Sequence, residues 1–513
     1  METQAKVVIV GAGIGGLAAA MLLAHAGCAV TVIEAQATPG GKMRTLATEA
    51  GPVDAGPTVL TLRPVFDALF ADVGLRPEDH LTLRPLDTLA RHYWPDGATL
   101  DLMADAGDSA ARIAQVFGDG SADDFRRFSA RAARLFAAFE VPMMQAAQPS
   151  QADLVRRVIR QPRLALDMAP HKTLAGLVAS SFREPRLAQL FARYATYVGG
   201  SPGASPALLS LIWEAEARGV WTVDGGMHAL ALTLSRLAEG FGATFRYATP
   251  VRRIVKQGGK VSGVDTETGF VPADMVLFNG DPAALQAGLL GPAPKAAVAE
   301  AAVMPRSLSA HVASFAAVPE GVPLAHHTVF FADDAEAEFA AIATGAVPQD
   351  ATLYICAQDH DAAPGALQRF EIIRNAAPLG ERPTPEDFSC QTLMFDRLRQ
   401  FGLHFSPGPV TLTGPGDFAR LFPGSRGSLY GRSPQGLTAA LQRPTARTAV
   451  TGLYLCGGGT HPGAGVPMAT LSARHAVAMM LSDHASTLTS RQADTRGGMS
   501  TGSAKTGKKP FPS

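Results

Sequence analysis

A glycine-rich turn near the start of the chain limits what this sequence can fold into. Residues 6–10 form a short apolar run rich in β-branched side chains. They lead into the pattern Gly-x-Gly-x-x-Gly, made by Gly11, Gly13 and Gly16, and an apolar stretch of helical character follows over residues 17–26. In dinucleotide-binding units the first glycine permits the tight turn, the second lets backbone N–H groups approach a pyrophosphate, and the third lets helix and strand pack closely. The pattern therefore predicts a strand, a turn and a helix whose N-terminus binds a dinucleotide.

An acidic residue at the end of the next strand completes this fingerprint. Residues 29–33 read as a second strand that ends in Glu34, about 20 residues after the glycines. A carboxylate at this place can accept hydrogen bonds from both ribose hydroxyls, and it would repel the 2′-phosphate of NADP. The sequence therefore predicts a dinucleotide other than NADP.

A second glycine pair after the acidic residue favours a flavin. Gly40 and Gly41 are followed by Lys42 and Arg44. This arrangement resembles FAD enzymes of the glutathione-reductase-like class, and the resemblance implies a loop beside the diphosphate that an arginine can approach. A surface turn with solvated charges is the alternative interpretation.

Length and composition narrow the class of protein. A chain of 513 residues is long enough for two or three domains. The 45 basic and 45 acidic residues balance, and no basic cluster interleaves with aromatic residues, so nothing indicates nucleic-acid binding. Charged residues make up only 18% and apolar residues 47%, which suits an apolar substrate or a membrane surface. No stretch reaches the ~18 uninterrupted apolar residues of a membrane span, so we expect any membrane contact to be peripheral.

The four cysteines, Cys28, Cys356, Cys390 and Cys456, are scattered along the chain. Their spacing argues against a disulfide framework, a zinc site or a dithiol redox pair, and it suits a reducing cytoplasm. We expect them to be small buried hydrophobic residues.

The region from residue 105 to 219 has a helical pattern that prolines divide into short helices. Four arginines, Arg156, Arg157, Arg160 and Arg163, lie among apolar residues in its middle. They predict either a lid or membrane-surface element that meets anionic lipid, or the solvated face of a helical insertion.

A second glycine-rich turn lies near the end of the chain. Residues 452–456 read as a strand, residues 457–465 hold a glycine cluster, and a helix is predicted over about 469–481. Such a turn suggests that the chain returns to the same nucleotide, with a helix N-terminus aimed at the flavin pyrimidine ring. FAD is for this reason predicted in place of NAD. We expect residues 485–513 to be disordered, because they are polar and carry prolines near the end.

The sequence lacks the signatures of several other chemistries. It contains no H-E-x-x-H and no P-loop. His326 and His327 stand in a strand-like context, so we expect them to point to opposite faces and not to share a metal ion. No metal site and no catalytic base is predicted.

These motifs together resemble the CrtI-type carotenoid and phytoene desaturases. The resemblance rests on the N-terminal fingerprint with residues 39–42, on residues 56–58, 225–227 and 273–281, and above all on residues 460–467. Within that family the sequence is most similar to CrtD, the hydroxyneurosporene (methoxyneurosporene) desaturases of purple bacteria. Met468 departs from many phytoene desaturases, which carry glycine there. It could narrow a substrate channel, although simple helix packing is the favoured interpretation.

The resemblance implies a fold, a cofactor and an activity. The fold is α/β, with a Rossmann-like, glutathione-reductase-like FAD-binding domain, a discontinuous substrate domain and a helical lid or membrane-contact insertion. The activity is FAD-dependent introduction of a double bond at the 3,4 position of an acyclic 1-hydroxycarotenoid, with quinone or oxygen as electron acceptor. The resemblance also implies a cytoplasmic protein that is peripherally associated with the inner (photosynthetic) membrane. The residues expected to hold FAD are Gly11, Gly13, Gly16, Glu34, Gly41, Lys42, Arg44, Pro57, Thr58, Val251, Gly458, Val466, Pro467 and Met468.

The domain organisation predicted on this basis is discontinuous. The FAD-binding domain takes residues 1–80, 220–288 and 446–484, the substrate domain 81–104 and 289–445, the helical insertion 105–219 and the tail 485–513.

Four other functions remain open on the sequence. They are a phytoene desaturase, a redox-neutral carotenoid isomerase, a flavin amine oxidase and a non-catalytic carotenoid carrier. The amine oxidase is disfavoured because His461 and Pro462 flank the second glycine turn, without an aromatic pair to cage an amine.

Overall fold

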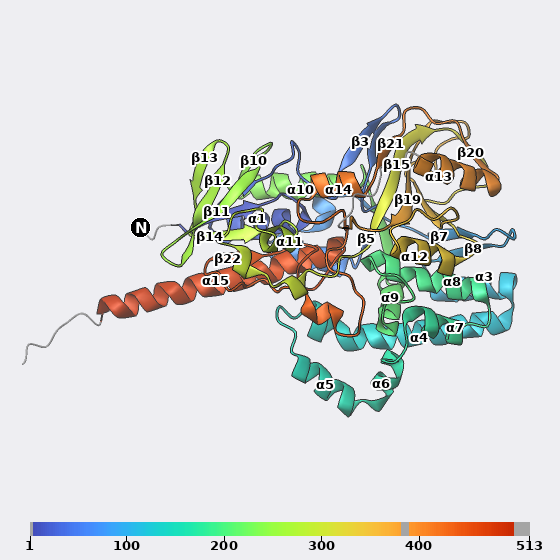
Figure 1. Ribbon diagram of the computed structural model, residues 1–513, viewed down its shortest axis with the longest axis horizontal. Helices are drawn as coiled ribbons and strands as arrows, with labels where there is room; N and C mark the ends of the chain where they lie inside the picture. Colours follow the sequence, from blue (N-terminus) through green and yellow to red (C-terminus); the bar gives the residue numbers. More distant parts are fainter. Residues whose placement is uncertain (1–3, 381–388, 497–513) are drawn as a thin grey trace, which may run out of the picture.

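The computed structural model describes residues 4–380 and 389–496. Two large sheets and a helical region surround a shared interior (Figure 1). The smaller sheet carries the predicted dinucleotide fingerprint, and the larger one forms the wall opposite it.

The first sheet has five parallel strands in the order β10-β2-β1-β14-β22. Its strands come from three distant parts of the sequence. They are β1 (Lys6–Val10), β2 (Ala29–Ile33), β10 (Thr244–Arg246), β14 (Met275–Phe278) and β22 (Leu453–Leu455). The central strands β1 and β14 are short apolar runs that are buried on both faces, whereas the edge strand β10 is largely exposed. The sequence predicted β1, β2 and β22 to within a few residues.

Helices cover one face of this sheet and a small antiparallel sheet covers the other. The helices are α1 (Ile14–His25), α10 (Met227–Gly240) and α15 (Val466–Arg496). Helix α1 packs against both α10 and α15 through its alanine and leucine side chains, so nearly all of α1 is buried. The small sheet consists of β11 (Val251–Gln257), β12 (Lys260–Thr266) and β13 (Gly269–Pro272).

The second large sheet has seven strands in the order β21-β15-β19-β18-β17-β7-β8. Only the β17–β7 pair is parallel. The strands are β21 (Thr411–Thr413), β15 (Ser309–Ala317), β19 (Gln368–Ala376), β18 (Leu353–Ala357), β17 (His327–Phe330), β7 (Thr88–Tyr93) and β8 (Thr99–Met103). One face packs phenylalanines beneath α13 (Ser389–Gln400), and the other face looks into the interior.

The helical region lies beyond the edge of this sheet (Figure 1). It is built of α3 (Ala106–Phe117), α4 (Asp119–Phe139), the π-helical turn Glu140–Met144, α5 (Gln151–Arg160), α6 (Pro162–Met168), α7 (Leu174–Ser181), α8 (Pro185–Ala192), α9 (Ile212–Ala217) and the 3₁₀ turns Arg193–Val198 and Ala207–Leu211. Prolines stand at the first positions of α6 and α8, as the sequence predicted.

Shorter elements complete the chain. They are β3 (Thr45–Thr48), β4 (Gly51–Asp54), β5 (Leu60–Thr61), β6 (Leu83–Pro85), β9 (Val220–Val223), β16 (Pro319–Gly321), β20 (Leu403–Phe405), α2 (Pro64–Ala71), α11 (Pro282–Gln286), α12 (Ala335–Ala343), α14 (Pro415–Leu421), and 3₁₀ turns at Pro77–Asp79, Lys295–Ala297, Glu300–Ala302 and Ala439–Gln442.

Two sequence-based predictions of local structure were wrong. Gly51 and Pro52 in the sequence predict a turn, but residues 51–54 form β4 and pair with β3 in a hairpin. Residues 485–496, expected to be disordered, continue α15, because apolar side chains of its N-terminal half pack on α1 and sustain a long helix. The remainder of the predicted tail, residues 497–513, lies outside the described residues.

No helix within residues 4–380 and 389–496 is both long and apolar enough to cross a membrane. The four cysteines are all buried and free, as predicted.

Candidate functional site

One cavity of about 1370 Å³ runs through the interior. Typical ligand pockets measure about 300–1,000 Å³, so this one has room for more than a single small molecule. Its wall includes the glycine turns of the parallel sheet, the inner face of the seven-stranded sheet and helices α5 and α6. The cavity therefore joins the predicted dinucleotide site to the helical region.

The N-terminal fingerprint forms one end of the cavity. Gly11 and Gly13 line it, and Gly11 has a φ of +101°, which favours glycine. Gly16 does not line the cavity. A Cβ atom at Gly16 would lie 2.1 Å from the backbone oxygen of Gly11, so this glycine permits the close approach of α1 to the turn after β1. The first-turn N–H groups of α1 have no intrahelical partner and face the cavity at Ile14 and Gly15.

Asn279 holds this turn and was missed by the sequence reasoning. Its side-chain amide donates to the backbone oxygens of Gly11, at 3.1 Å, and Gly13, at 3.3 Å. Asn279 directly follows β14, the neighbour of β1, and ligands of parallel sheets bind at such carboxyl ends. The run of polar residues after this buried strand was the signal that could have identified it.

Glu34 lies at the carboxyl end of β2 on the cavity wall and is buried. Its carboxylate accepts hydrogen bonds from the backbone N–H groups of Ala12, at 2.6 Å, and Gln36, at 2.8 Å. These bonds orient the carboxylate beside the fingerprint. The arrangement matches the residue type and position expected for a ribose contact.

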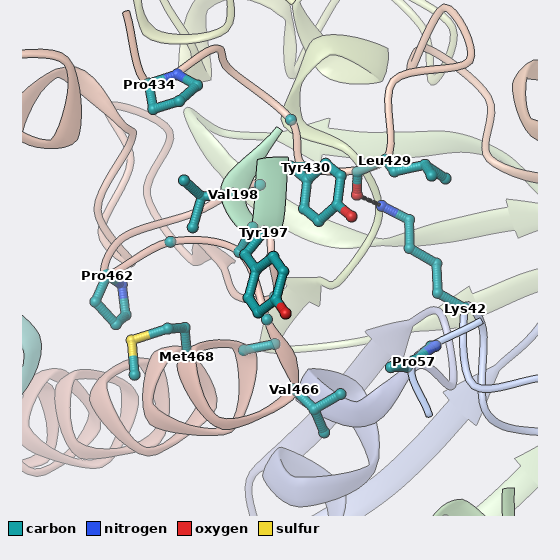
Figure 2. A pocket seen from close by; sticks show the side chains of 18 of the residues that line it. Lys42, Pro57, Tyr197, Val198, Leu429, Tyr430, Pro434, Pro462, Val466 and Met468 are labelled. Atoms are coloured by element: carbon teal, nitrogen blue, oxygen red, sulfur yellow. Dashed lines mark hydrogen bonds between the residues drawn. The ribbon is translucent and has the colours of Figure 1, made fainter. Parts of the chain in front are cut away.

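The loop after Glu34 brings two basic residues to the cavity. Gly41 lines the wall next to Gly13. Lys42 donates a hydrogen bond to the carbonyl of Leu429 (Figure 2), and burial lowers its pKa to about 8. Arg44 donates to Thr413 Oγ1 at 3.0 Å, so in this structure its guanidinium faces the seven-stranded sheet. A role of Arg44 at a diphosphate stays a prediction.

The remaining predicted cofactor residues also meet at the cavity. Every predicted site residue except Gly16 lines it, among them Pro57, Thr58, Val251, Gly458, Val466, Pro467 and Met468. Figure 2 shows Pro57, Val466 and Met468 around the same space, with Tyr197 and Tyr430 between them and the seven-stranded sheet. The α15 N-terminus thus reaches the cavity, as the second glycine turn predicted.

A chain of polar contacts continues from the loop to the seven-stranded sheet. Thr58 Oγ1 lies 2.7 Å from Tyr354 Oη, which lies 2.6 Å from His327 Nδ1. Burial holds the pKa of His327 well below its usual range. Burial, and then the nearby Asp54, raise the pKa of Glu371 well above its usual range. These groups lie in an otherwise mainly apolar wall.

A half-buried arginine, Arg193, adjoins this chain of contacts. The guanidinium carbon of Arg193 lies 5.1 Å from the ring centre of Tyr197 and 5.5 Å from that of Tyr354. Arg193 Nη1 donates to Tyr197 Oη at 2.9 Å, and Tyr194 Oη donates to Glu216 Oε2 at 2.5 Å. Polar side chains of the 3₁₀ turn therefore bond one another and Glu216 of α9.

The argument against a shared metal at His326 and His327 was wrong. His326 precedes β17, so strand alternation does not separate the two rings, and their centres lie 4.5 Å apart. Possible ligand atoms of His326, His327 and Cys356 all lie within 4.8 Å of one another. Burial raises the pKa of the Cys356 thiol well above its usual range. The prediction of no metal remains untested.

The far end of the cavity is apolar. Leu154, Val155, Val158 and Ile159 of α5 and Met168 of α6 line it. These helices lie away from the parallel sheet (Figure 1). The cavity therefore offers a polar dinucleotide end and a long apolar arm.

Comparison with known proteins shows which protein family has this architecture. Residues 14–318 match the model of the flavin containing amine oxidoreductases. The chain is 55% identical to a hydroxyneurosporene desaturase of Cereibacter sphaeroides over 487 residues, which cover 94% of this chain and 98% of that one. The chain belongs to the flavin-containing amine oxidoreductase family. Within it, the chain belongs with the CrtI-type carotenoid desaturases and is most like CrtD, as the sequence motifs predicted.

A more distant relative and a solved structure extend the comparison. A lycopene-forming phytoene desaturase of Pseudescherichia vulneris is 30% identical over 493 residues, 93% of this chain and 99% of its own. The solved structure of a putrescine oxidase triple mutant has a TM-score of 0.61 at 15% identity, over 94% of this chain and 99% of that one. This likeness confirms the α/β flavoprotein fold.

The family makes this protein an FAD-dependent oxidoreductase. The site suits FAD on its own residues, since Gly11, Gly13 and the first turn of α1 line the cavity and Glu34 stands at the ribose position.

Proposed function

We propose that this protein introduces the 3,4 double bond into acyclic 1-hydroxycarotenoids, in carotenoid biosynthesis of the spheroidene and spirilloxanthin type. The single observation that carries the proposal is the cavity that joins a dinucleotide site to a long apolar arm. The higher identity to a hydroxyneurosporene desaturase than to a phytoene desaturase, 55% against 30%, favours the hydroxylated substrate.

We propose that FAD is held by the residues predicted from the sequence. When bound, FAD accepts the hydride that leaves an allylic carbon. The turn of Gly11 and Gly13 receives the diphosphate, Glu34 the ribose, and the N-terminus of α15 the pyrimidine ring. The full set is Gly11, Gly13, Gly16, Glu34, Gly41, Lys42, Arg44, Pro57, Thr58, Val251, Gly458, Val466, Pro467 and Met468, with Gly16 acting through helix packing.

The apolar arm orients the polyene and excludes water. Loss of a hydride leaves a cation that is delocalised along the conjugated chain, so removal of the neighbouring proton needs only a modest base. Side chains such as Leu154, Val158 and Met168 supply an apolar wall for the chain. The main contribution of the protein is therefore to position the polyene, and a strong general base is not required.

We propose that α5 and α6 dock on a membrane and admit the carotenoid from it. Val155, Ile159 and Leu166 are 57%, 72% and 79% exposed, although all three are apolar. Val155 and Ile159 also line the cavity, so the exposed surface and the apolar arm are continuous. Arg156, Arg160 and Arg163 lie near them in the chain, are exposed and suit an anionic lipid surface, whereas Arg157 donates to the carbonyl of Ala138.

This docking would place the enzyme on the cytoplasmic face of the inner membrane, in peripheral contact. A quinone in that membrane, or oxygen, would reoxidise the flavin. Both acceptors suit the proposal, and reoxidation rates with each, measured after anaerobic reduction, decide between them.

The deciding experiment offers 1-hydroxyneurosporene and phytoene separately to the FAD-loaded protein with liposomes under anaerobic conditions. Flavin bleaching, the carotenoid spectrum and product mass are followed. We expect loss of two hydrogens and a red shift from the hydroxylated substrate. Conversion of phytoene alone would contradict the proposal, an unchanged mass with altered geometry would indicate an isomerase, and turnover of amines would indicate an amine oxidase.

A further inference from the structure

A row of polar side chains crosses the inner face of the seven-stranded sheet. In the strand register Ser314 of β15 lies opposite Glu371 of β19, Glu371 opposite Cys356 of β18, and Cys356 opposite His327 of β17. Residues directly opposite one another point to the same face. The row is therefore built by the sheet and not by chance contact of loops.

The row is buried and largely unpaired. Glu371 is 0% exposed and His327 5%. Within the part of the chain that the structure describes, both carboxylate oxygens of Glu371, Nε2 of His327 and Oγ of Ser314 have no hydrogen-bond partner. A buried polar group without a partner costs about 1–3 kcal/mol, so several of them in one row indicate that a ligand group completes them.

The surroundings of the row show where such a ligand would sit. Glu371 and His327 both line the cavity. Two residues farther along their strands, Ile373 and Val329 give the same wall an apolar surface. The row is thus a band of polar side chains across an apolar wall. Such a wall fits a ligand that is apolar except for one polar group.

The row is also fixed relative to the predicted flavin site. Tyr354 lies within hydrogen-bond distance of both His327 Nδ1 and Thr58 Oγ1, which ties the ring of His327 to the loop after β4. His327 therefore presents Nε2 in a fixed direction close to the residues expected beside the flavin.

We propose that His327 and Glu371 form a subsite that hydrogen-bonds the tertiary hydroxyl at C1 of the carotenoid end group. A hydroxyl is both donor and acceptor, so it can satisfy one group of each kind. C1 and the reacting C3 are separated by one carbon, so a hydroxyl-binding group must stand near the flavin, as this row does. The inference rests on the proposed function and deepens it, because it names the residues that select a hydroxylated end group.

The test compares 1-hydroxyneurosporene with neurosporene, which lacks the hydroxyl, in detergent micelles. The variants are His327→Phe, which keeps a ring, and Glu371→Leu. A site built around a hydroxyl discriminates strongly against its absence. We expect the wild type to favour the hydroxylated substrate in kcat/KM by at least about 100-fold, and we expect each variant to lose most of that ratio, chiefly through a lower kcat/KM for 1-hydroxyneurosporene.

Matched controls separate recognition from structure. Ile373→Val, an apolar change in the same wall, should alter both substrates alike. His327→Gln and Glu371→Gln, which keep hydrogen-bonding groups, should restore part of the preference. FAD occupancy of each variant is measured in parallel, and if the Phe or Leu variants fail to fold, the Gln variants carry the test through their intermediate ratio.

A second readout does not depend on turnover. With the flavin fully reduced, the holoenzyme cannot accept a hydride, and binding of the two carotenoids is measured from the shift of their spectra. Equal binding of both carotenoids by the wild type, or an unchanged preference in His327→Phe and Glu371→Leu, would overturn the subsite.

A stoichiometric metal ion found in the purified holoenzyme would also overturn the subsite, because the ion would occupy the ring nitrogen of His327. A wild type that binds 1-hydroxyneurosporene preferentially but converts neither carotenoid would overturn the proposed function and leave the subsite supported.

Discussion

The two polar regions of the cavity wall differ in how their polar groups are satisfied. At the N-terminal fingerprint Glu34 accepts two backbone N–H bonds and Asn279 donates to two backbone oxygens. Across the cavity, Glu371 and His327 Nε2 have no partner among the described residues. In the first region the side chains are already hydrogen-bonded to the backbone. In the second region polar side-chain atoms are left without partners.

This difference indicates different kinds of ligand. A cradle built from backbone and glycine suits a cofactor with fixed shape and many polar groups. Isolated polar side chains in an apolar wall suit a mostly apolar molecule with one polar end. We therefore expect substitutions at the fingerprint to affect folding and FAD binding, and substitutions elsewhere in the cavity to affect the substrate.

The largest effect should come from Gly16→Ala. The new Cβ would lie 2.1 Å from the backbone oxygen of Gly11, so α1 must move away from the turn. We expect a loss of about 3 kcal/mol or more in the free energy of unfolding, with little FAD retained. Urea unfolding and flavin content measure both. Gly240→Ala is the control, since nothing lies within 4 Å of a Cβ there, and a normally stable Gly16→Ala protein would contradict the packing role.

Glu34→Ala should weaken FAD binding while the fold persists. The substitution removes the expected ribose acceptor and leaves the N–H of Ala12 without its bond. We expect the Kd for FAD to rise by about 100-fold, because one charged hydrogen-bonding group contributes about 1.5–3 kcal/mol. Fluorescence titration of apoprotein gives the value, with the exposed Glu239→Ala as control. An unchanged Kd would contradict the ribose role.

A triple substitution of Val155, Ile159 and Leu166 to serine should separate the membrane surface from the active site. The exposed apolar area that would enter the lipid is lost, so we expect binding to anionic vesicles to fall by at least tenfold. Turnover of liposome-embedded carotenoid should fall with it, whereas turnover in detergent should change less. The control is Val116→Ser, an exposed apolar residue on α3. Equal loss in detergent and liposomes would count against docking.

Lys42→Met should change the pH dependence of stability in the FAD-free protein. Burial lowers the pKa of Lys42 to about 8, below its ordinary 10.5. Between these values the unfolded chain holds the proton and the folded one releases it, so this group makes the free energy of unfolding rise with pH, by at most about 1.4 kcal/mol per pH unit. The variant should lack this contribution, and urea unfolding at pH 7.5 and 9.5 compares the two. If the free energy of unfolding changes with pH in the same way in the wild type and in Lys42→Met, the pKa of Lys42 is not lowered by folding.

Met468→Gly should have the smallest effect. Met468 lines the cavity at the start of α15, so its favoured interpretation as helix packing is incomplete. Removing the side chain enlarges the cavity, and we expect a change of only a few-fold in the relative kcat/KM for 1-hydroxyneurosporene and phytoene. Product analysis by mass gives the ratio. An unchanged ratio with lower stability would return Met468 to a packing role.

Much of the parallel sheet and its helices could be predicted because local patterns encode them. Residues 29–33 were predicted as a strand with the bounds that the structure has. Helix α15 was predicted too short, because its length beyond residue 481 depends on no apolar pattern of its own. The hairpin at residues 45–54 was missed, since glycine and proline in residues 51–52 read as a turn.

The sequence by itself determined the dinucleotide fold, the cofactor and the family. Glycine spacing, an acidic residue after a strand and a second glycine turn are local features, and each acts through backbone geometry that neighbours in the chain define. Only the tertiary structure decided which side chains share the far wall of the cavity. Glu371, Cys356 and His327 are brought into one row by strand pairing, and pairing between strands separated in sequence leaves no local pattern, because it depends on how the whole sheet is assembled.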